Sequence, residues 1–431
     1  MAFVHEDSCE CSKTELDLFL VPPTQTAIES SQHIEHRPLS SLSDGAPIEF
    51  AIMGSGDEYL DLSDTYMLVT VKINKPNGSS LAETDNTIGP VNNWIHSLFS
   101  QVDVTLNDRL VTPSTNTYAY RAYIENLLSY GPAAKESHLT SAMWYTDTSG
   151  YMNDTSTNNL GFNLRKSRTA LSAKVTLVAR PHIDLAFQDR FILNGVDIKM
   201  RFVLSKSLFN LMGTGVTHID DMSLFVRKVK VSPSVVVGHL KAMEHGTAKY
   251  PIRRVETKVF SIPKGNLSAN QENLFLGQLP KRVIIGMVDN AAFNGTADSN
   301  PFEFKHKSVD FVSLYMDGVQ FPSKPYKPDF NNKLYARSYL SVFSGTGMIN
   351  RDQGNGISYS DYANGFSLWG FDLSPDLNDG SHFNVTKHGN LRLELRFKEA
   401  LTVTINVIVY AEFDNVIEID SSRNVLFDYS A

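Results

Sequence analysis

The stretch Asp103-Val-Thr-Leu-Asn-Asp-Arg-Leu-Val111 predicts two short strands joined by an Asn-Asp turn. A break at Pro113-Ser114 follows, because proline and serine interrupt the strand pattern. The next stretch, Tyr118 to Gly131, carries apolar residues at helical spacing and predicts a helix. The sequence therefore indicates a strand–turn–strand–helix unit in the first half of the chain.

The same unit recurs in the second half of the chain. Asp310-Phe-Val-Ser-Leu-Tyr-Met-Asp-Gly-Val-Gln-Phe321 again predicts strand, turn and strand. A break at Pro322-Ser323 follows, and a helix is predicted over Asn332 to Gly345. A repeat at a spacing of roughly 200 residues indicates a duplicated domain and not a solenoid.

Length and composition favour a globular β-protein. A chain of 431 residues predicts two or three domains, each large enough to bury a core. Aromatic residues are 10% of the chain, with 25 Phe and 17 Tyr against 3 Trp, which favours strands. The net charge of -8 is spread along the chain, so we expect no direct sequence-specific binding of nucleic acid, which requires a basic face.

The cysteines and the apolar segments indicate the compartment. The two cysteines, Cys9 and Cys11, both lie near the N-terminus, so no disulfide is expected within the globular part, as in a reducing compartment. The first ten residues are acidic and lack the apolar core of a signal peptide. The longest apolar stretches have strand length, so no transmembrane segment is predicted. We expect a soluble intracellular protein.

Strand and turn signals divide the chain into four parts. Residues 1–45 read as an N-terminal arm, with Pro22-Pro23, many Ser and Thr, and one compact apolar patch from Leu16 to Val21. The predicted parts are the arm at 1–45, a first jelly roll at 46–232, a connector at 233–251, and a second jelly roll with a C-terminal tail at 252–431. Each half holds about eight strands, so the predicted fold is all-β, two tandem eight-stranded jelly-roll sandwiches, each with a short inserted helix.

Two stretches outside the repeat are predicted to be surface. Residues 131–168 are rich in Ser, Thr, Asn and Tyr without a sustained period, and we interpret them as a long surface insertion. The loop 345–363 is interpreted in the same way.

Motifs for catalysis or for binding a cofactor or a metal are weak in this sequence. Cys9-Glu-Cys11 and His33-Ile-Glu-His36 have poor zinc spacing in an arm-like segment. Asp57, Asp61 and Asp64 lack the calcium-loop pattern. Neither a phosphate loop nor a serine nucleophile elbow occurs. We therefore predict no catalytic residue, no cofactor and no metal, and we do not expect an enzyme.

Several strings resemble one protein family. They are Glu15-Leu-Asp-Leu-Phe with Pro22-Pro-Thr-Gln-Thr26, Pro47-Ile-Glu-Phe50, Tyr59-Leu-Asp-Leu-Ser-Asp-Thr-Tyr66, Gly370-Phe-Asp-Leu-Ser-Pro-Asp376 and Gly389-Asn-Leu-Arg-Leu-Glu-Leu-Arg-Phe397. With them the chain resembles the double jelly-roll major capsid proteins of the Polinton (Maverick) and adintovirus group, relatives of adenovirus hexon and virophage capsid proteins. The resemblance covers residues 15 to 429, nearly the whole chain.

The resemblance implies a function in assembly. It implies a homotrimer with a pseudo-hexagonal outline that tiles an icosahedral shell, with penton and minor capsid proteins as further partners. It places the protein in the virion, made in the host cytoplasm and assembled there or in the nucleus. The assembly contacts that we expect are the arm residues Leu16, Leu18, Phe19, Leu20 and Val21 and the insertion residues Trp144, Tyr145 and Tyr151.

Two other classes of function stay open. Jelly rolls also bind carbohydrate or attach to hosts, and Trp144, Tyr145 and Tyr151 are of the type that stacks on sugars. A cupin-like enzyme would need clustered histidines, whereas His182 and His218 are isolated in the strand regions.

Overall fold

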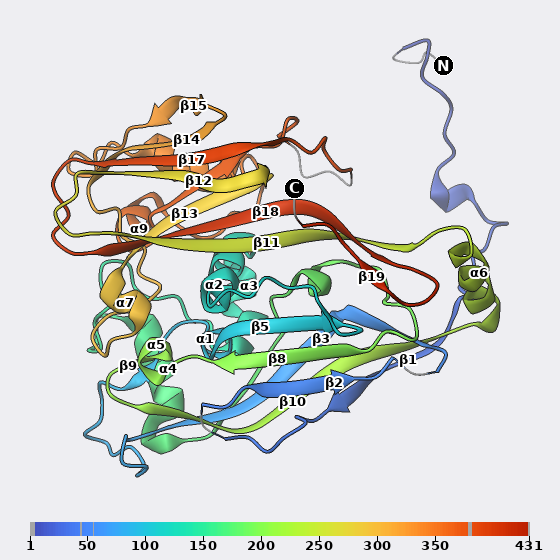
Figure 1. Cartoon of the computed structure of the whole chain (residues 1–431), viewed down its shortest axis with the longest axis horizontal. Helices are drawn as coiled ribbons and strands as arrows, with labels where there is room; N and C mark the ends of the chain where they lie inside the picture. Colours follow the sequence, from blue (N-terminus) through green and yellow to red (C-terminus); the bar gives the residue numbers. More distant parts are fainter. Residues whose placement is uncertain (1–4, 44, 55, 378–381, 430–431) are drawn as a thin grey trace.

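The computed structural model describes residues 5–43, 45–54, 56–377 and 382–429. They form two β-sandwiches, one from each half of the chain, with helices between them (Figure 1). Residues 1–4 of the predicted arm and 430–431 of the predicted tail lie outside this description.

The first sandwich has four strands in each of two antiparallel sheets. One sheet has the order β1 (Ile28–His36), β10 (Val216–Val231), β3 (Glu58–Asn74) and β7 (Val175–Ala179). The other has the order β2 (Ile48–Ile52), β8 (Ile198–Leu204), β5 (Phe99–Leu106) and β6 (Arg109–Leu110). A short pair, β4 (Gly89–Pro90) and β9 (Leu211–Met212), lies outside them. The eight strands have jelly-roll connectivity.

The second sandwich repeats this order strand for strand. One sheet contains β11 (Ala248–Ile262), β18 (Ile405–Ile419), β13 (Arg282–Asp289) and β16 (Leu368–Asp372), with β19 (Val425–Leu426) added to β18. The other contains β12 (Ser268–Gln278), β17 (His388–Phe397), β14 (Val309–Met316) and β15 (Val319–Tyr326). The predicted pair of eight-stranded jelly rolls is confirmed.

The helices lie mostly in the connections between strands. They are α1 (Trp94–Ser97), α2 (Tyr118–Ser129), α3 (Pro132–Glu136), α4 (Leu160–Thr169), α5 (Ser207–Asn210), α6 (Pro233–Met243), α7 (Asn290–Asn294), α8 (Ala336–Ser344) and α9 (Tyr359–Ala363). Four short 3-10 turns are η1 (Thr14–Leu16), η2 (His138–Ala142), η3 (Ala170–Ser172) and η4 (Asp184–Phe187). Helices α2 and α8 occupy the same slot, after β6 and after β15, as the repeat predicts.

The two predicted turns adopt the same backbone conformation. Asn107 and Asp108 have φ values of 44° and 65°, and Asp317 and Gly318 have 49° and 83°. Positive φ at both central residues matches the right-handed twist of a hairpin, and Asn, Asp and Gly tolerate it best.

Two details of the repeat differ from the prediction. The break predicted at Pro322-Ser323 does not end the strand, since β15 runs to Tyr326, but it coincides with a shift in the pairing of β15 with β14 between Phe321 and Tyr326. Because β15 is an edge strand, proline there removes no hydrogen bond to a further strand. Helix α8 begins at Ala336 and not at Asn332, whose backbone N–H donates to the Asp329 side chain in a local turn.

The predicted part boundaries also need correction. Residues 28–36, assigned to the arm, form β1, and nearly all of β1 pairs with the second half of β10, from Leu224 to Val231. The connector is largely a helix, α6, which begins at Pro233, and β11 already starts at Ala248. The C-terminal tail predicted at the end of the second jelly roll is partly strand, because β18 runs to Ile419 and β19 pairs with it.

The 131–168 insertion is a packed helical segment and not an open surface loop. It contains α3, η2 and most of α4, and its side chains Trp144, Met152 and Phe162 are each 1% exposed. Arg165 and Asp147 form a buried ion pair within it at 2.5 Å. The insertion was predicted to be surface because of its polar composition, but it contains a buried core of its own.

The buried side chains form three clusters: one inside each sandwich and a third between them. In β13, Val283, Ile285 and Met287 face the second sandwich's core, while Ile284 and Val288 face the cluster between the sandwiches. The β11-β18-β13-β16 sheet is therefore buried on both faces at this point, which explains the unbroken apolar sequence of β13.

Candidate functional site

Helix α2 forms the centre of the junction between the two sandwiches. Its Tyr123 ring stacks on Phe302 with centroids 4.2 Å apart, and Tyr120 packs edge-on against Phe302 and stacked on Phe293. The partner surface is the outer face of the β11-β18-β13-β16 sheet, with Ile284 and Leu368 in the same cluster. The first sandwich contributes a helix and the second contributes a sheet.

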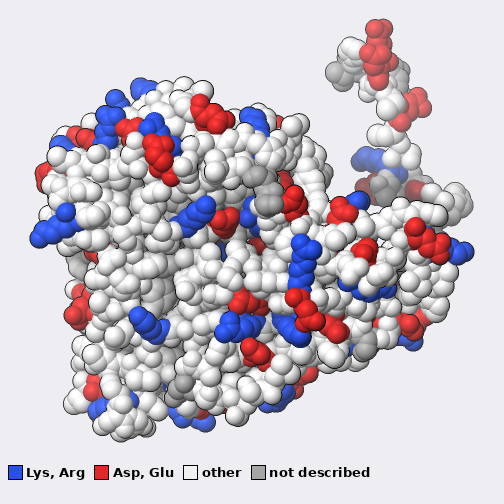
Figure 2. Space-filling view, in the orientation of Figure 1, with Lys and Arg blue, Asp and Glu red and all other residues white. Residues whose placement is uncertain are grey.

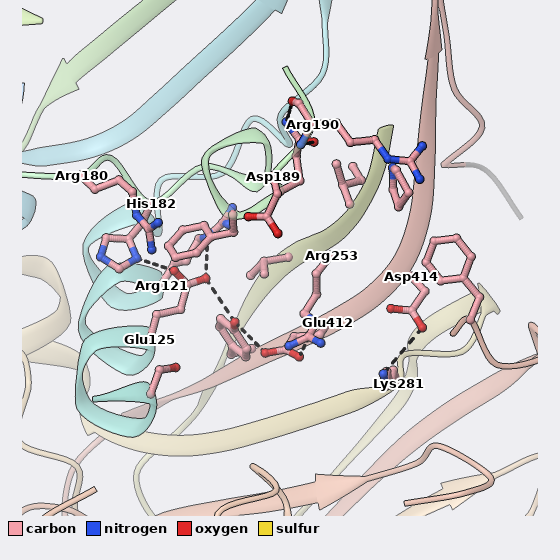
Figure 3. Close-up of a pocket in the computed structure, with 18 of the residues that line it drawn as sticks. Arg121, Glu125, Arg180, His182, Asp189, Arg190, Arg253, Lys281, Glu412 and Asp414 are labelled. Atoms are coloured by element: carbon pink, nitrogen blue, oxygen red, sulfur yellow. Dashed lines mark hydrogen bonds and ion pairs between the residues drawn. The ribbon is translucent and has the colours of Figure 1, made fainter. Parts of the chain in front are cut away.

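A buried group of charges lies at one edge of this junction (Figure 3). The Arg121 guanidinium pairs with Glu125 at 2.9 Å and with Asp184 at 2.7 Å. Glu125 also pairs with the His182 ring and accepts a hydrogen bond from the Tyr410 hydroxyl of β18 at 3.2 Å. Asp184 accepts from the Val255 backbone N–H of β11 at 3.2 Å. The charges therefore join the two halves through hydrogen bonds with specified geometry.

Arg121, Glu125 and His182 of this group also line an open cleft of about 740 Å³. Lining side chains from the second half include Arg253, Glu412 and Asp414, and Arg180 and Asp189 come from the first half. Cations and carboxylates alternate along its wall, and Glu412 pairs with Arg282 at 3.1 Å. Because the wall contains both cations and carboxylates, its side chains are better suited to pair with one another across the junction than to bind a ligand of a single charge.

The protonation states at this junction follow from burial. Burial would raise the pKa of Glu125, but Arg121 and His182 lower it to about 2. Burial lowers the pKa of His182, and its hydrogen bond to Glu125 offsets this only in part. Burial, reinforced by His182, holds the pKa of His96 well below 6.5. Both histidines are therefore neutral in the folded protein at neutral pH.

We predict that mild acid destabilises this junction. Below pH 6.5 the unfolded chain binds more protons at both histidines than the folded chain does, so stability falls as pH falls. The slope for each histidine is at most about 1.4 kcal/mol per pH unit, and Glu125 stays ionised throughout. Urea unfolding from pH 7 to pH 5 measures the fall, and His96→Gln/His182→Gln should flatten it. Equal slopes in both proteins would contradict this assignment.

The second copy of the repeated helix lacks the cover that the first one has. Arg121-Ala-Tyr-Ile124 in α2 corresponds to Arg337-Ser-Tyr-Leu340 in α8. Ile124 is 1% exposed within the junction, whereas Leu340 is 47% exposed. In α8 the buried residues are Ser338, Ser341 and Val342, which face the protein's own interior.

The first copy of the repeated sheet is uncovered in the same sense. In β3, Met67, Val69 and Val71 are fully buried inside the sandwich, while Tyr66 and Leu68 on the outer face are half-buried. The Tyr66 ring stacks on Phe225 of β10 at 4.9 Å on this outer face. Among the described residues, no helix packs on this face as α2 packs on the corresponding sheet of the second sandwich.

The C-terminal segment fixes the two sandwiches to each other. Arg423 donates to the Asn194 backbone carbonyl at 2.7 Å, and Asn107 donates to the Arg423 carbonyl at 2.8 Å. Arg109 donates to the Val425 carbonyl at 2.8 Å and stacks over the Phe427 ring. The chain end of the second half thus binds the hairpin of the first half.

The predicted arm contacts are all solvent-exposed. The exposed fractions are 73% for Leu16, 76% for Leu18, 94% for Phe19, 76% for Leu20 and 86% for Val21. Five large apolar side chains in six residues lack cover from the described part of their own chain, which is unusual for a folded protein.

The predicted aromatic contacts do not form one surface. Trp144 is 1% exposed, packs against Tyr123 and donates from Nε1 to Thr146, so its assignment as a surface contact is wrong. Tyr145 is half-buried, and Tyr151 is 51% exposed. The stacking platform expected of a carbohydrate site is therefore not assembled from these three residues.

The insertion and the 345–363 loop pack against each other. Lys135 of α3 donates from Nζ to the backbone carbonyls of Leu127 at 2.6 Å and Asn355 at 2.5 Å. Burial lowers the pKa of Lys135 to about 7. These two segments, predicted as separate surfaces, are one unit.

The other predicted chemistry finds no common site. His182 lies in the junction, whereas His218 lies on β10 beside Asp220. Within the described residues, no group of three or more His, Cys, Asp or Glu side chains has metal-binding geometry. No helix in the described ranges is long and apolar enough to cross a membrane.

The charged junction of Arg121, Glu125 and Asp184 was not predicted from the sequence. Arg121 and Glu125 have the i, i+4 spacing of a helical ion pair, and this was an available signal. Their third partner, Asp184, is distant in sequence and could be found only from the fold.

Comparison with known proteins agrees with the fold. No family model matches the sequence. The uncharacterized protein F54H12.2 of Caenorhabditis elegans is 28% identical over 432 residues, covering 95% of this chain and 99% of that protein.

Solved structures of viral capsids are similar to the chain. A chain of the Sputnik virophage structure has a TM-score of 0.66 at 11% identity, covering 100% of this chain and 95% of that one. A chain of the PBCV-1 virus capsid has 0.61 at 11%, covering 96% and 100%. The mavirus major capsid protein has 0.53 at 11%, covering 99% and 97%. These neighbours are structural capsid proteins and not enzymes, and the similarity establishes the double jelly-roll fold.

Proposed function

We propose that the protein is a major capsid protein, that three copies form a pseudo-hexagonal capsomer, and that capsomers tile an icosahedral shell in a virion. The main support for this proposal is the junction inside the chain, in which different surfaces of the two sandwiches meet head to tail. The helix of the first sandwich covers the sheet of the second, which leaves the helix of the second and the sheet of the first uncovered.

Copies joined by a head-to-tail interface form a closed ring when the rotation from one copy to the next divides a full turn evenly. In this proposal, α8 of one copy packs on the outer face of the β1-β10-β3-β7 sheet of the next copy, with Leu340 where Ile124 lies in the internal junction. Three chains supply six sandwiches, and every junction in the ring then has the same components. The similarity to the mavirus major capsid protein supports the same role.

Two finer assignments belong to the same proposal. The strings quoted for the resemblance support a place in the Polinton and adintovirus group. In a shell, penton and minor capsid proteins are the expected further partners. On the face shown in Figure 2, Lys and Arg alternate with Asp and Glu without a large patch of one sign, which suits contacts between like subunits.

The mass in solution tests the trimer. Light scattering after size exclusion should give three times the chain mass of 48.0 kDa, and electron microscopy of that peak should show hexagonal outlines. Deletion of residues 1–24 should leave the trimer intact because it spares β1, whereas a cut at residue 40 would remove that strand. A protein that stays monomeric at every concentration would refute the proposal.

A further inference from the structure

An apolar groove lies under the connector helix α6. Its volume is about 500 Å³, and its wall is formed by α6, the start of β1, the end of β10 and the start of β11. The lining side chains include Ile28, Phe191, Val235, Met243 and Tyr250.

Helix α6 is unusually apolar for its exposure. Its sequence, Pro233-Ser-Val-Val-Val-Gly-His-Leu-Lys-Ala-Met243, buries only Met243. Val237 is 50% exposed and Leu240 is 48% exposed. A helix of this composition normally has its apolar side against a partner. Val235, Ala242 and Met243 of this helix line the groove, whereas Val237 and Leu240 lie outside its lining, so α6 presents apolar side chains both in the groove and beyond it.

The exposed arm patch Leu16–Val21 has the complementary properties. It is apolar, and the arm around it is acidic, with Glu6, Asp7, Glu10, Glu15 and Asp17 against Lys13 and His5. The groove's charged and ionisable wall residues other than tyrosine are Arg190, His239 and Lys249, all of basic type, and Lys249 also pairs with Glu418 at 3.4 Å. Apolar fit and opposite charge thus favour the same pairing.

The chain's own geometry disfavours insertion of the arm into its own groove. Ala27 and Ile28 line the groove, so the arm leaves the body at this place, and Figure 1 shows it projecting away beside α6. Pro22-Pro23 follows the patch directly, and proline pairs hold a chain extended. Return of Val21 to the groove would require a reversal within residues 24–26.

We propose that the arm patch Leu16–Val21 of one copy binds in the α6 groove of a second copy, with the arm's carboxylates toward Arg190 and Lys249. This inference rests on the proposed function and names the partner of its arm. The contact links copies without using the α8 surface, so the two interfaces are separable.

Single-cysteine pairing tests the contact on the full-length chain. In a Cys9→Ser/Cys11→Ser background, one protein carries Leu20→Cys and another carries Ala242→Cys in the groove wall. When the two are assembled together and oxidised, we expect a disulfide between the two chains. Ser234→Cys, on the same helix outside the groove, is the matched control and should give at least tenfold less product.

A second variant keeps the test independent of thiols. Ala242→Glu retains good helix propensity and places a carboxylate in the groove, while Ser234→Glu places it outside. Trypsin cleavage at Lys13 should become at least tenfold faster with Ala242→Glu and stay unchanged with Ser234→Glu. Unchanged cleavage with both variants would count against the groove.

The outcomes separate this inference from the trimer proposal. Trimer mass is measured on the same samples under reducing conditions. Trimers without the interchain disulfide overturn the arm contact and leave the proposed function standing. A chain with both cysteines that forms only an internal disulfide shows that the arm occupies its own groove, and this also overturns the contact.

Discussion

Leu340→Asp converts the trimer into monomers at micromolar concentration. In the proposed ring this side chain is buried once in each of three interfaces, at the position that Ile124 occupies within the chain. Burying the exposed half of this leucine contributes about 1 kcal/mol, and an unpaired Asp carboxylate in its place adds at least about 1–2 kcal/mol at each interface. Three interfaces lose roughly 6–9 kcal/mol, which corresponds to about a 10⁴- to 10⁶-fold weaker trimer. Sedimentation across a concentration series measures the shift.

The complementary surface should respond in the same way. Leu68→Glu, on the half-buried outer face of β3, removes the other side of the same contact. Val403→Asp is the control, since this residue is 42% exposed, close to the value for Leu340, but lies between β17 and β18. Its trimer should persist. Dissociation by all three variants would indicate general destabilisation, and dissociation by none would exclude the α8 interface.

Arg165→Met lowers the free energy of unfolding by about 3–5 kcal/mol, the usual cost of leaving a buried charge without its partner. Arg165 and Asp147 both have fully buried side chains, and Arg165 also donates to the Pro90 carbonyl at 2.9 Å. Asp147 in turn accepts from Asn300 of the second half at 3.0 Å. Loss of Arg165 therefore leaves Asp147 as a buried unpaired carboxylate and weakens its contact with Asn300, which joins the two halves.

Two further variants separate charge from packing. Arg168→Met removes an exposed arginine of the same helix, whose guanidinium lies over the Tyr145 ring, and should cost less than about 1 kcal/mol. Asp147→Leu combined with Arg165→Met should recover part of the stability, because no lone charge is left buried. Urea unfolding at pH 7 compares them. A double variant no more stable than Arg165→Met alone would mean that packing, not charge, dominates.

The repeated unit could be predicted from the sequence because its turns and strands depend on neighbouring residues and not on distant partners. The Asn107-Asp108 and Asp317-Gly318 turns need positive φ, which few residues tolerate, so the turns are visible in the sequence. The unbroken apolar sequence of β13 likewise reflects burial of both faces. The fold class follows from such segments.

Other parts depend on distant partners. Strand β1 is a polar edge strand whose identity comes from pairing with β10, about 190 residues later, so its sequence resembles a free arm. Trp144 is buried because α2 and the insertion converge on it, and a Ser- and Thr-rich neighbourhood gave no sign of that. The uncovered faces of α8 and β3 were also invisible, since exposure is a property of the assembled chain.

The two-sided burial of the β11-β18-β13-β16 sheet has a consequence for synthesis on the ribosome. The first sandwich is contiguous from β1 to β10, so all of its strands leave the exit tunnel before the second sandwich is complete. Its own sheets leave only a half-buried outer face in water, and it can form early. The second sandwich exposes a largely apolar sheet face, with Ile284, Leu368 and Ile408, until α2 covers it. Because α2 is synthesised earlier, it is available to cover this sheet face as the second half folds, and we expect this order to limit aggregation during translation.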